Sequence, residues 1–286
     1  MVRRRRRRST SLGSLMIIFF LLVFLGGVVV VVSFLYRNQE KSLELTENFC
    51  PVEGPIYTLA ILLDATDGVT EITKLSIKNK IENEIKNLQR YGKMELYVVS
   101  GEGLSLPLDE ICNPGNKSDL SNLGQKGIVA NPILIQKKYN QFVSSSLTAV
   151  DKILNRSFEA NESPLLKSIQ KVSLLLKKPT DYSASHGASA TRNKVIFITD
   201  FLENTDVFSM YGLKNSLLEN FESSRAFEKY GANFSEIDIE IWLVQRNHPN
   251  APSTTEVKKF WLSVFKQYFD KTEPGTFQII PLPGEL

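Results

Sequence analysis

Apolar and polar residues form blocks along the chain, and the blocks predict strands and helices in alternation. Nearly continuous apolar runs, typical of strands buried on both faces of a sheet, occupy residues 56–63, 94–100, 194–199, 237–244 and 277–280. Apolar residues at helical spacing predict helices at residues 70–91, 133–155, 164–176, 213–229 and 253–270. This alternation predicts an α/β fold, a three-layer sandwich around a mostly parallel sheet.

The longest apolar run lies near the N-terminus and predicts a transmembrane helix. Residues 15–36 carry no charge, and about 22 residues at roughly 1.5 Å rise each form a helix long enough to cross the bilayer core. Six arginines, Arg3–Arg8, precede this run, and arginine favours the cytoplasmic side of a membrane. We therefore expect a cytoplasmic tail at 1–14, a single-pass anchor at 15–36, a stalk at 37–55 and one domain at 56–286.

The charge pattern places that domain outside the cytoplasmic membrane, which means the periplasm if the cell is Gram-negative. A cleavable signal peptide is the alternative to a retained anchor. Its apolar core normally spans about 7–15 residues and leads to small residues at a cleavage site. The run in this chain is longer, continues into Phe34, Leu35 and Tyr36, and has no such site.

The positive net charge of the chain comes from the arginines of its N-terminal tail. The whole chain has 34 Lys and Arg against 31 Asp and Glu, a formal net charge of +3. Without the six tail arginines, 28 basic residues remain against 31 acidic ones, so the rest of the chain has a formal net charge of −3. This balance provides no broad basic surface, and we expect no nucleic-acid partner.

The two cysteines, Cys50 and Cys112, both follow the predicted anchor. Two thiols of one domain often pair in an oxidising compartment. We therefore expect a disulfide between the predicted stalk and a long loop at 101–132, which is rich in Gly, Pro, Asn and Ser. The alternative is two buried thiols that never meet. Two cysteines without a pair of histidines are a poor zinc site.

Two predicted strands end in aspartate, and this pattern predicts a polar cleft. Asp64 follows the first strand and Asp200 follows the third. Ligands of parallel sheets bind beyond the carboxyl ends of the strands, so both carboxylates line one cleft if these strands are neighbours. Thr66 lies on the turn after the first strand. Ser163 is predicted to be the N-cap of a helix that has Pro164 at its first position.

In these positions the chain resembles the von Willebrand factor A-type (VWA) domains. Their metal-ion-dependent adhesion site uses Asp-x-Ser-x-Ser after the first strand, a Thr from a later loop and an Asp after the fourth strand. This chain offers Asp64-Ala65-Thr66-Asp67-Gly68, then Ser163, then Asp200. The resemblance covers about residues 55–282 and implies a VWA/Rossmann-like fold.

The resemblance also implies a site for Mg²⁺ or Mn²⁺. Its ligands would be Asp64, Thr66, Ser163 and Asp200, because each hydroxyl replaces a hydroxyl of the family pattern and each carboxylate is kept. Gly68 stands where the family has its second Ser and supplies no ligand atom. The alternative is a degenerate site, in which both aspartates are hydrogen-bonded to helix N-termini.

The segments Asp64–Gly68 and Cys112–Gly115 also resemble a group of bacterial membrane-anchored VWA-like proteins. This second resemblance implies a protein of a prokaryotic cell envelope. We expect a protein-interaction module for adhesion or scaffolding, with a protein partner in the envelope and no enzymatic activity. The alternatives are a metal-dependent phosphotransferase or hydrolase, and a structural envelope component without an ion site.

The sequence offers little support for catalysis. Asp64 and Asp67 are three residues apart, whereas haloacid-dehalogenase-type phosphotransferases use Asp-x-Asp. The only histidines, His186 and His248, lie in predicted polar loops, where a general base is not expected. The pattern also leaves open whether the apolar residues after Asp200 form a partner-binding patch or fold back over the sheet. These residues are Phe201, Leu202, Phe208, Met210 and Tyr211.

Overall fold

The computed structural model divides the chain into two compact units, Met1–Leu43 and Glu44–Leu286. It describes residues 12–37, 45–52, 54–107, 109–118, 131–156, 160–176, 192–212, 216–235, 237–246, 250–268 and 275–283. The first unit contains one helix, α1 (Leu12–Arg37), which includes the whole predicted segment 15–36. Among the residues whose side chains are described, no helix has both the length and the apolar character needed to cross a membrane.

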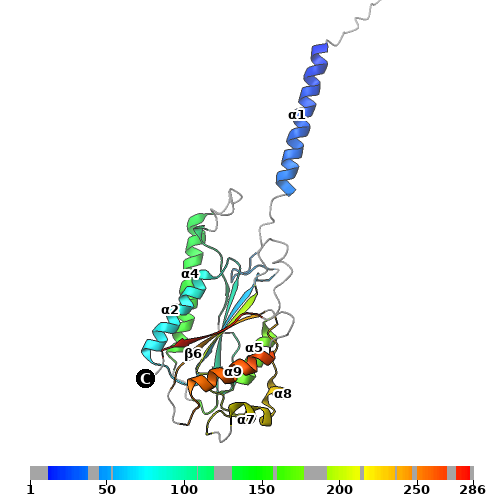
Figure 1. Ribbon diagram of the computed structural model, residues 1–286. Coiled ribbons are helices and arrows are strands. Elements are labelled where there is room, and N and C mark those ends of the chain that lie inside the picture. The colour runs from blue at the N-terminus through cyan, green and yellow to red at the C-terminus, as the bar shows by residue number, and fades with distance from the viewer. Residues whose placement is uncertain are drawn as a thin grey trace, which may run out of the picture. The chain divides into compact units, whose positions relative to one another are not determined.

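The second unit is built on one seven-stranded sheet (Figure 1). Its strands lie in the order β3-β2-β1-β5-β6-β7, and β4 also pairs with β2. The pairs β1–β2, β1–β5, β5–β6 and β6–β7 are parallel, so the predicted mostly parallel sheet is confirmed. The strands are β1 (Thr58–Asp64), β2 (Lys93–Ser100), β3 (Gly103–Leu104), β4 (Asp109–Cys112), β5 (Asn193–Thr199), β6 (Ile237–Val244) and β7 (Phe277–Leu282).

Helices cover both faces of this sheet (Figure 1). The helices are α2 (Glu71–Asn87), α4 (Pro132–Leu154), α5 (Leu165–Leu175), α7 (Leu217–Ser224), α8 (Ala226–Tyr230) and α9 (Thr254–Tyr268). Alternate residues of β1 supply the two cores, because successive side chains of a strand point to opposite faces. Leu59, Ile61 and Leu63 pack with α2 and α4, whereas Ala60 and Leu62 pack with α5 and α9.

Two expected elements differ from the structure. The helix predicted at 213–229 is divided into α7 and α8 by Arg225, which adopts the left-handed conformation with φ of 55°. Apolar periodicity does not detect this break, because Phe221 in α7 and Ala226 in α8 are buried in the same core. The loop expected at 101–132 contains the short antiparallel strands β3 and β4, while residues 119–130 lie outside the described residues.

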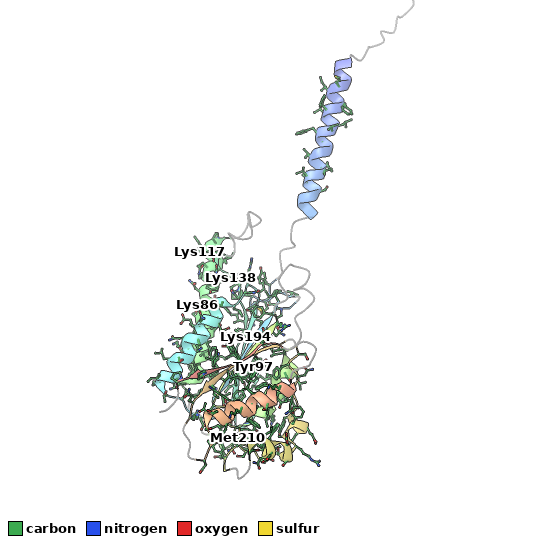
Figure 2. The ribbon with its side chains drawn as sticks, in the orientation of Figure 1. Lys86, Tyr97, Lys117, Lys138, Lys194 and Met210 are labelled. Carbon is green, nitrogen blue, oxygen red and sulfur yellow. A yellow bond between two sulfur atoms is a disulfide. The ribbon has the colours of Figure 1, made fainter. Side chains whose placement is uncertain are left out.

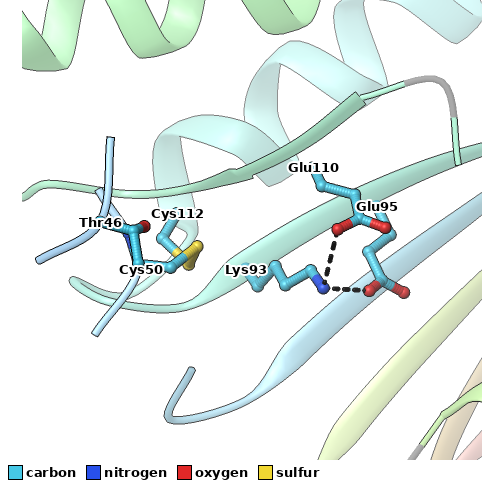
Figure 3. The surroundings of a disulfide bond; sticks show 6 residues. All are labelled: Thr46, Cys50, Lys93, Glu95, Glu110 and Cys112. Atoms are coloured by element: carbon cyan, nitrogen blue, oxygen red, sulfur yellow. Dashed lines mark hydrogen bonds and ion pairs between the residues drawn. A yellow bond between two sulfur atoms is a disulfide. The ribbon is translucent and has the colours of Figure 1, made fainter. Parts of the chain in front are cut away.

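The predicted disulfide between Cys50 and Cys112 is present and links residues 62 positions apart (Figure 3). Cys112 ends β4, and its backbone N–H donates to the Asn48 carbonyl at 3.0 Å. The disulfide therefore holds the segment before β1, where a stalk was expected, against the edge of the sheet. Lys93 lies nearby and pairs with Glu95 at 2.5 Å and with Glu110 at 3.4 Å, which links β2 to β4 (Figure 3).

Candidate functional site

The structure brings the ends of β1 and β5 together at one edge of the sheet. Their parallel register aligns Leu63 with Ile198, so Asp64 and Asp200 both follow at the carboxyl ends of neighbouring strands. Thr199 joins the two strands at this edge, because its Oγ1 donates to Asp64 Oδ2 at 2.6 Å. Burial raises the pKa of Asp200, and the charge of the neighbouring Asp64 raises it further. The two carboxyl groups thus lie at the carboxyl ends of neighbouring strands.

Asp64 accepts three hydrogen bonds, which hold the turn after β1. The Thr66 backbone N–H donates to Asp64 Oδ1 at 3.0 Å, and Thr66 Oγ1 donates to the same oxygen at 2.7 Å. The third bond is the one from Thr199. Burial raises the pKa of Asp64, although these hydrogen bonds and the charge of Arg246 oppose the shift by stabilising the carboxylate. Asp64 therefore acts as an internal acceptor that shapes the edge of the sheet.

Asp200 has a positively charged partner that the sequence pattern did not identify. Arg246 follows β6, the strand next to β5, and its Nε lies 2.6 Å from Asp200 Oδ2. Asp200 Oδ1 accepts a hydrogen bond from the Leu202 backbone N–H at 3.0 Å. Burial and the repulsion from Asp64 raise the pKa of Asp200 to about 7, whereas Arg246 lowers it. Arg246 thus supplies a positive charge beside the two carboxyl groups.

Ser163 lies in the site, but it is not the N-cap that the sequence predicted. The N-cap of α5 is Pro164, which makes no side-chain capping bond. Ser163 instead exchanges backbone hydrogen bonds with Asn204 at 2.9 and 3.1 Å, and its Oγ lies 3.4 Å from Thr66 Oγ1. The prediction was wrong because of a tertiary contact. Asn204, in the loop after β5, binds the backbone of Ser163 before the helix begins.

The capping role at α5 belongs to Glu203, which the sequence analysis did not select. Its Oε2 accepts the Leu166 backbone N–H at 2.8 Å, and its Oε1 accepts the Thr205 hydroxyl at 3.0 Å. The side chain is fully buried. Burial raises the pKa of Glu203 to about 7, against the lowering effect of these hydrogen bonds. A sequence signal for this contact is lacking, because Glu203 and Leu166 are 37 residues apart.

The donor atoms present fit a divalent cation poorly. The two oxygens of Asp64 already accept hydrogen bonds from Thr66 and Thr199, and Gly68 offers no side-chain oxygen. Asp200 is paired with Arg246, whose charge repels a second cation at the same place. Within the described ranges, no cluster of three or more His, Cys, Asp or Glu side chains is arranged to hold a metal ion. His186 and His248 lie outside these ranges.

Four of the five apolar residues after Asp200 fold back into the core and Tyr211 is half-buried, so these residues form no exposed apolar patch. Phe201, Leu202, Phe208 and Met210 are buried in the core that contains α9, and Figure 2 labels Met210 in this part of the domain. The Phe201 ring meets the Trp261 ring edge-on with centroids 4.6 Å apart. The Trp261 indole N–H donates to the Phe201 carbonyl at 2.8 Å.

Exposed apolar side chains near the site come from α2 instead. This helix begins at the same edge of the sheet, seven residues after Asp64. Ile72 is 71% exposed and Leu75 is 60% exposed, although both lie in the first two turns of a helix whose opposite side is buried. The loop before them exposes Asp67 and Gly68. Ile72 and Leu75 therefore form an apolar surface next to the carboxyl ends of β1 and β5. We call these strand ends, with Asp64 and Asp200, the acidic edge.

The domain is an α/β sandwich whose strand order places Asp64, Thr66 and Asp200 after the carboxyl ends of β1 and β5, with Ser163 beside Thr66. Among solved structures, the chain is similar to the VWA domain of SpRpn10, with 10% identity, coverage of 80% of this chain and 89% of that one, and a TM-score of 0.41. It is also similar to a von Willebrand factor type A structure from Catenulispora acidiphila, with 10% identity, coverage of 79% and 39%, and a TM-score of 0.39. The chain matches no family model and no curated protein.

Proposed function

We propose that this protein is a membrane-anchored module that binds a protein partner in the cell envelope. The proposed anchor is the uncharged run 15–36 with Arg3–Arg8 before it, a charge pattern that favours a cytoplasmic N-terminus. The VWA-like domain would then lie outside the cytoplasmic membrane. The disulfide between Cys50 and Cys112 supports this orientation, because disulfides persist mainly in oxidising compartments.

The observation that carries the interaction proposal is the exposed apolar surface of Ile72 and Leu75. Exposed apolar side chains at a polar edge are typical of protein-binding surfaces, and here they border the carboxyl ends of β1 and β5. The occupant we propose is a protein that places apolar side chains on this first part of α2. We propose that the role of the domain is to bind this partner and not to catalyse a reaction.

Site-specific photo-crosslinking in intact cells tests this surface. A photoreactive phenylalanine analogue at position 72 is expected to capture one discrete protein, whereas the same analogue at position 174 is not. Leu174 is the matched control, because it is 76% exposed and lies at the far end of α5 from Ser163. Leu75→Asp is expected to reduce the adduct at position 72 by about tenfold or more, a loss of about 1.4 kcal/mol in binding.

Equal adducts at positions 72 and 174, or no effect of Leu75→Asp, would contradict the proposed surface. Leu174→Asp serves as the control for the substitution, because it also introduces a carboxylate at an exposed leucine. It should leave the adduct at position 72 unchanged. Unfolding temperatures of both variants, compared with the parent chain, distinguish a lost contact from a damaged fold.

A further inference from the structure

We propose that Arg246 is the resident counter-ion of the Asp64–Asp200 pair, and that it takes the place of a divalent cation at this edge of the sheet. The site would then work without a metal ion. This inference goes beyond the proposed function, because it concerns the charge balance of the site and needs no partner. It starts from the 2.6 Å contact between Arg246 Nε and Asp200 Oδ2.

The need for a counter-ion follows from the position of the two carboxyl groups, of which Asp200 is buried and Asp64 is half-buried. Asp200 is 8% exposed and lies next to Asp64 at the ends of adjacent strands. When both carboxyl groups are ionised their charges repel each other, because the protein interior screens them less than water does, and a nearby positive charge favours the ionised pair. Hydrogen bonds from Thr66 and Thr199 satisfy Asp64, but they add no positive charge. The guanidinium of Arg246 is the group that adds one.

The fold holds Arg246 in place for this role. It follows β6 by two residues, so its backbone lies at the same edge of the sheet as Asp200. Its side chain is only 22% exposed and lines a small recess with Leu202, Val244, Pro252 and Val257. Asp200 and Thr254 line the same recess, so Arg246 and its acidic partner lie together in a partly enclosed setting where their attraction is stronger than in open water.

A cation at this place would meet an unfavourable field. A divalent ion beside Asp200 would lie within a few ångströms of the Arg246 charge, and binding would require the arginine to leave its recess. The missing oxygen at Gly68 removes one direct ligand as well. Arg246 and Gly68 therefore both disfavour the binding of a divalent ion at this site.

Titration of the full-length protein in detergent with Mn²⁺ tests the proposal. Free Mn²⁺ is measured by electron paramagnetic resonance, and the unfolding temperature is measured with Mn²⁺ and with EDTA. We expect the parent chain to leave the Mn²⁺ signal unchanged and to unfold at the same temperature in both solutions. Arg246→Met removes the charge and keeps most of the apolar stem. We expect this variant to lower the free Mn²⁺ signal that the parent leaves unchanged, and to unfold at a higher temperature with Mn²⁺ than with EDTA.

Arg246→Lys is the matched control, because it keeps the positive charge; it should resemble the parent chain in both measurements. The proposal is overturned if the parent binds one Mn²⁺ that is lost in Asp200→Asn, or if Arg246→Met is as stable as the parent and binds no Mn²⁺. If Arg246→Met does not fold, the double variant Arg246→Met/Asp200→Asn decides. If the double variant folds, the proposed role of Arg246 as a counter-ion is supported. If the double variant also fails to fold, that role is overturned. None of these measurements involves a partner, so they do not depend on the crosslinking result.

Discussion

At the scale of single residues, the acidic edge is organised by buried hydrogen bonds and one ion pair. Thr199 joins β5 to Asp64, Arg246 joins β6 to Asp200, and Glu203 caps α5. Each partner lies on a different element from the residue it contacts, so each contact forms only when the sheet has formed. The carboxyl groups of Asp64, Asp200 and Glu203 all have a raised pKa because they are buried.

Glu203→Gln is expected to change how stability depends on pH. The pKa of Glu203 is about 7 in the folded protein, above its ordinary value of 4.5, so the folded state binds more protons between these values. Its contribution to stability is therefore fully present below about pH 4.5 and is lost as the pH rises through 7, at no more than about 1.4 kcal/mol per pH unit. Urea unfolding from pH 4.5 to 8 should show a shallower fall for Glu203→Gln than for the parent chain.

Glu222→Gln provides the control for this pH series, because Glu222 is exposed on α7. It should reproduce the parent profile. Identical slopes for Glu203→Gln and the parent would show that Glu203 does not titrate in this range. The glutamine keeps an oxygen for the Leu166 N–H, so the capping bond survives in the variant.

At the scale of elements, the N-terminal segment and β4 form one unit through the disulfide. Cys50 lies in the segment before β1, Cys112 ends β4, and β4 pairs with β2. The Asn113 amide adds a further tie, because it donates to the Leu88 carbonyl after α2. The chain after β2 is therefore held at Cys112 and Asn113 by covalent and hydrogen-bonded contacts.

Removal of this disulfide is expected to destabilise the domain. In the chain-entropy account, a cross-link that closes a loop of this length stabilises by about 4 kcal/mol. The double variant Cys50→Ser/Cys112→Ser should lose about that amount in urea unfolding of the full-length protein in detergent. The parent chain treated with a reductant should match the double variant. A loss below about 1 kcal/mol in both samples would mean that β4 is held by its other contacts.

At the scale of the whole molecule, two compact units correspond to two patterns in the sequence. The unit Met1–Leu43 contains the apolar run and the arginine tail, and the unit Glu44–Leu286 contains the sheet and its helices. The proposed anchor and the proposed interaction domain therefore divide near residue 43. Because the net positive charge resides in the tail, the proposed orientation depends on Arg3–Arg8.

Cysteine labelling in intact cells tests that orientation. A membrane-impermeant maleimide should label Ser253→Cys, before α9, in whole cells, whereas Ser9→Cys should react only after the membrane is opened. The native cysteines form a disulfide and do not react without a reductant. Replacement of Arg3–Arg8 by glutamines is expected to weaken this asymmetry. Labelling of Ser9→Cys and not of Ser253→Cys in whole cells would reverse the proposed topology.

The sequence alone predicted the main strands and helices, the layer architecture and the two strands that end in aspartate, but not β3, β4 or the break at Arg225. Strand and helix periods are local properties, and a buried parallel sheet requires the continuous apolar runs of β1, β5 and β6. The disulfide was also within reach, because the chain has only two cysteines. Position after a strand could have drawn attention to Arg246, which follows β6 at the edge where Asp64 and Asp200 were expected.

Only the tertiary structure decided how the edge is completed. Arg246 meets Asp200 from 46 positions away, and Glu203 reaches α5 from 37 positions away. The apolar residues after Asp200 turn inward because Trp261 and its neighbours on α9 receive them. Periodicity reports which side of an element is buried, but the partner on the other element depends on strand order and register. Strand order and register therefore decide that Arg246 lies at the acidic edge and that Ile72 and Leu75 are exposed on the surface of α2.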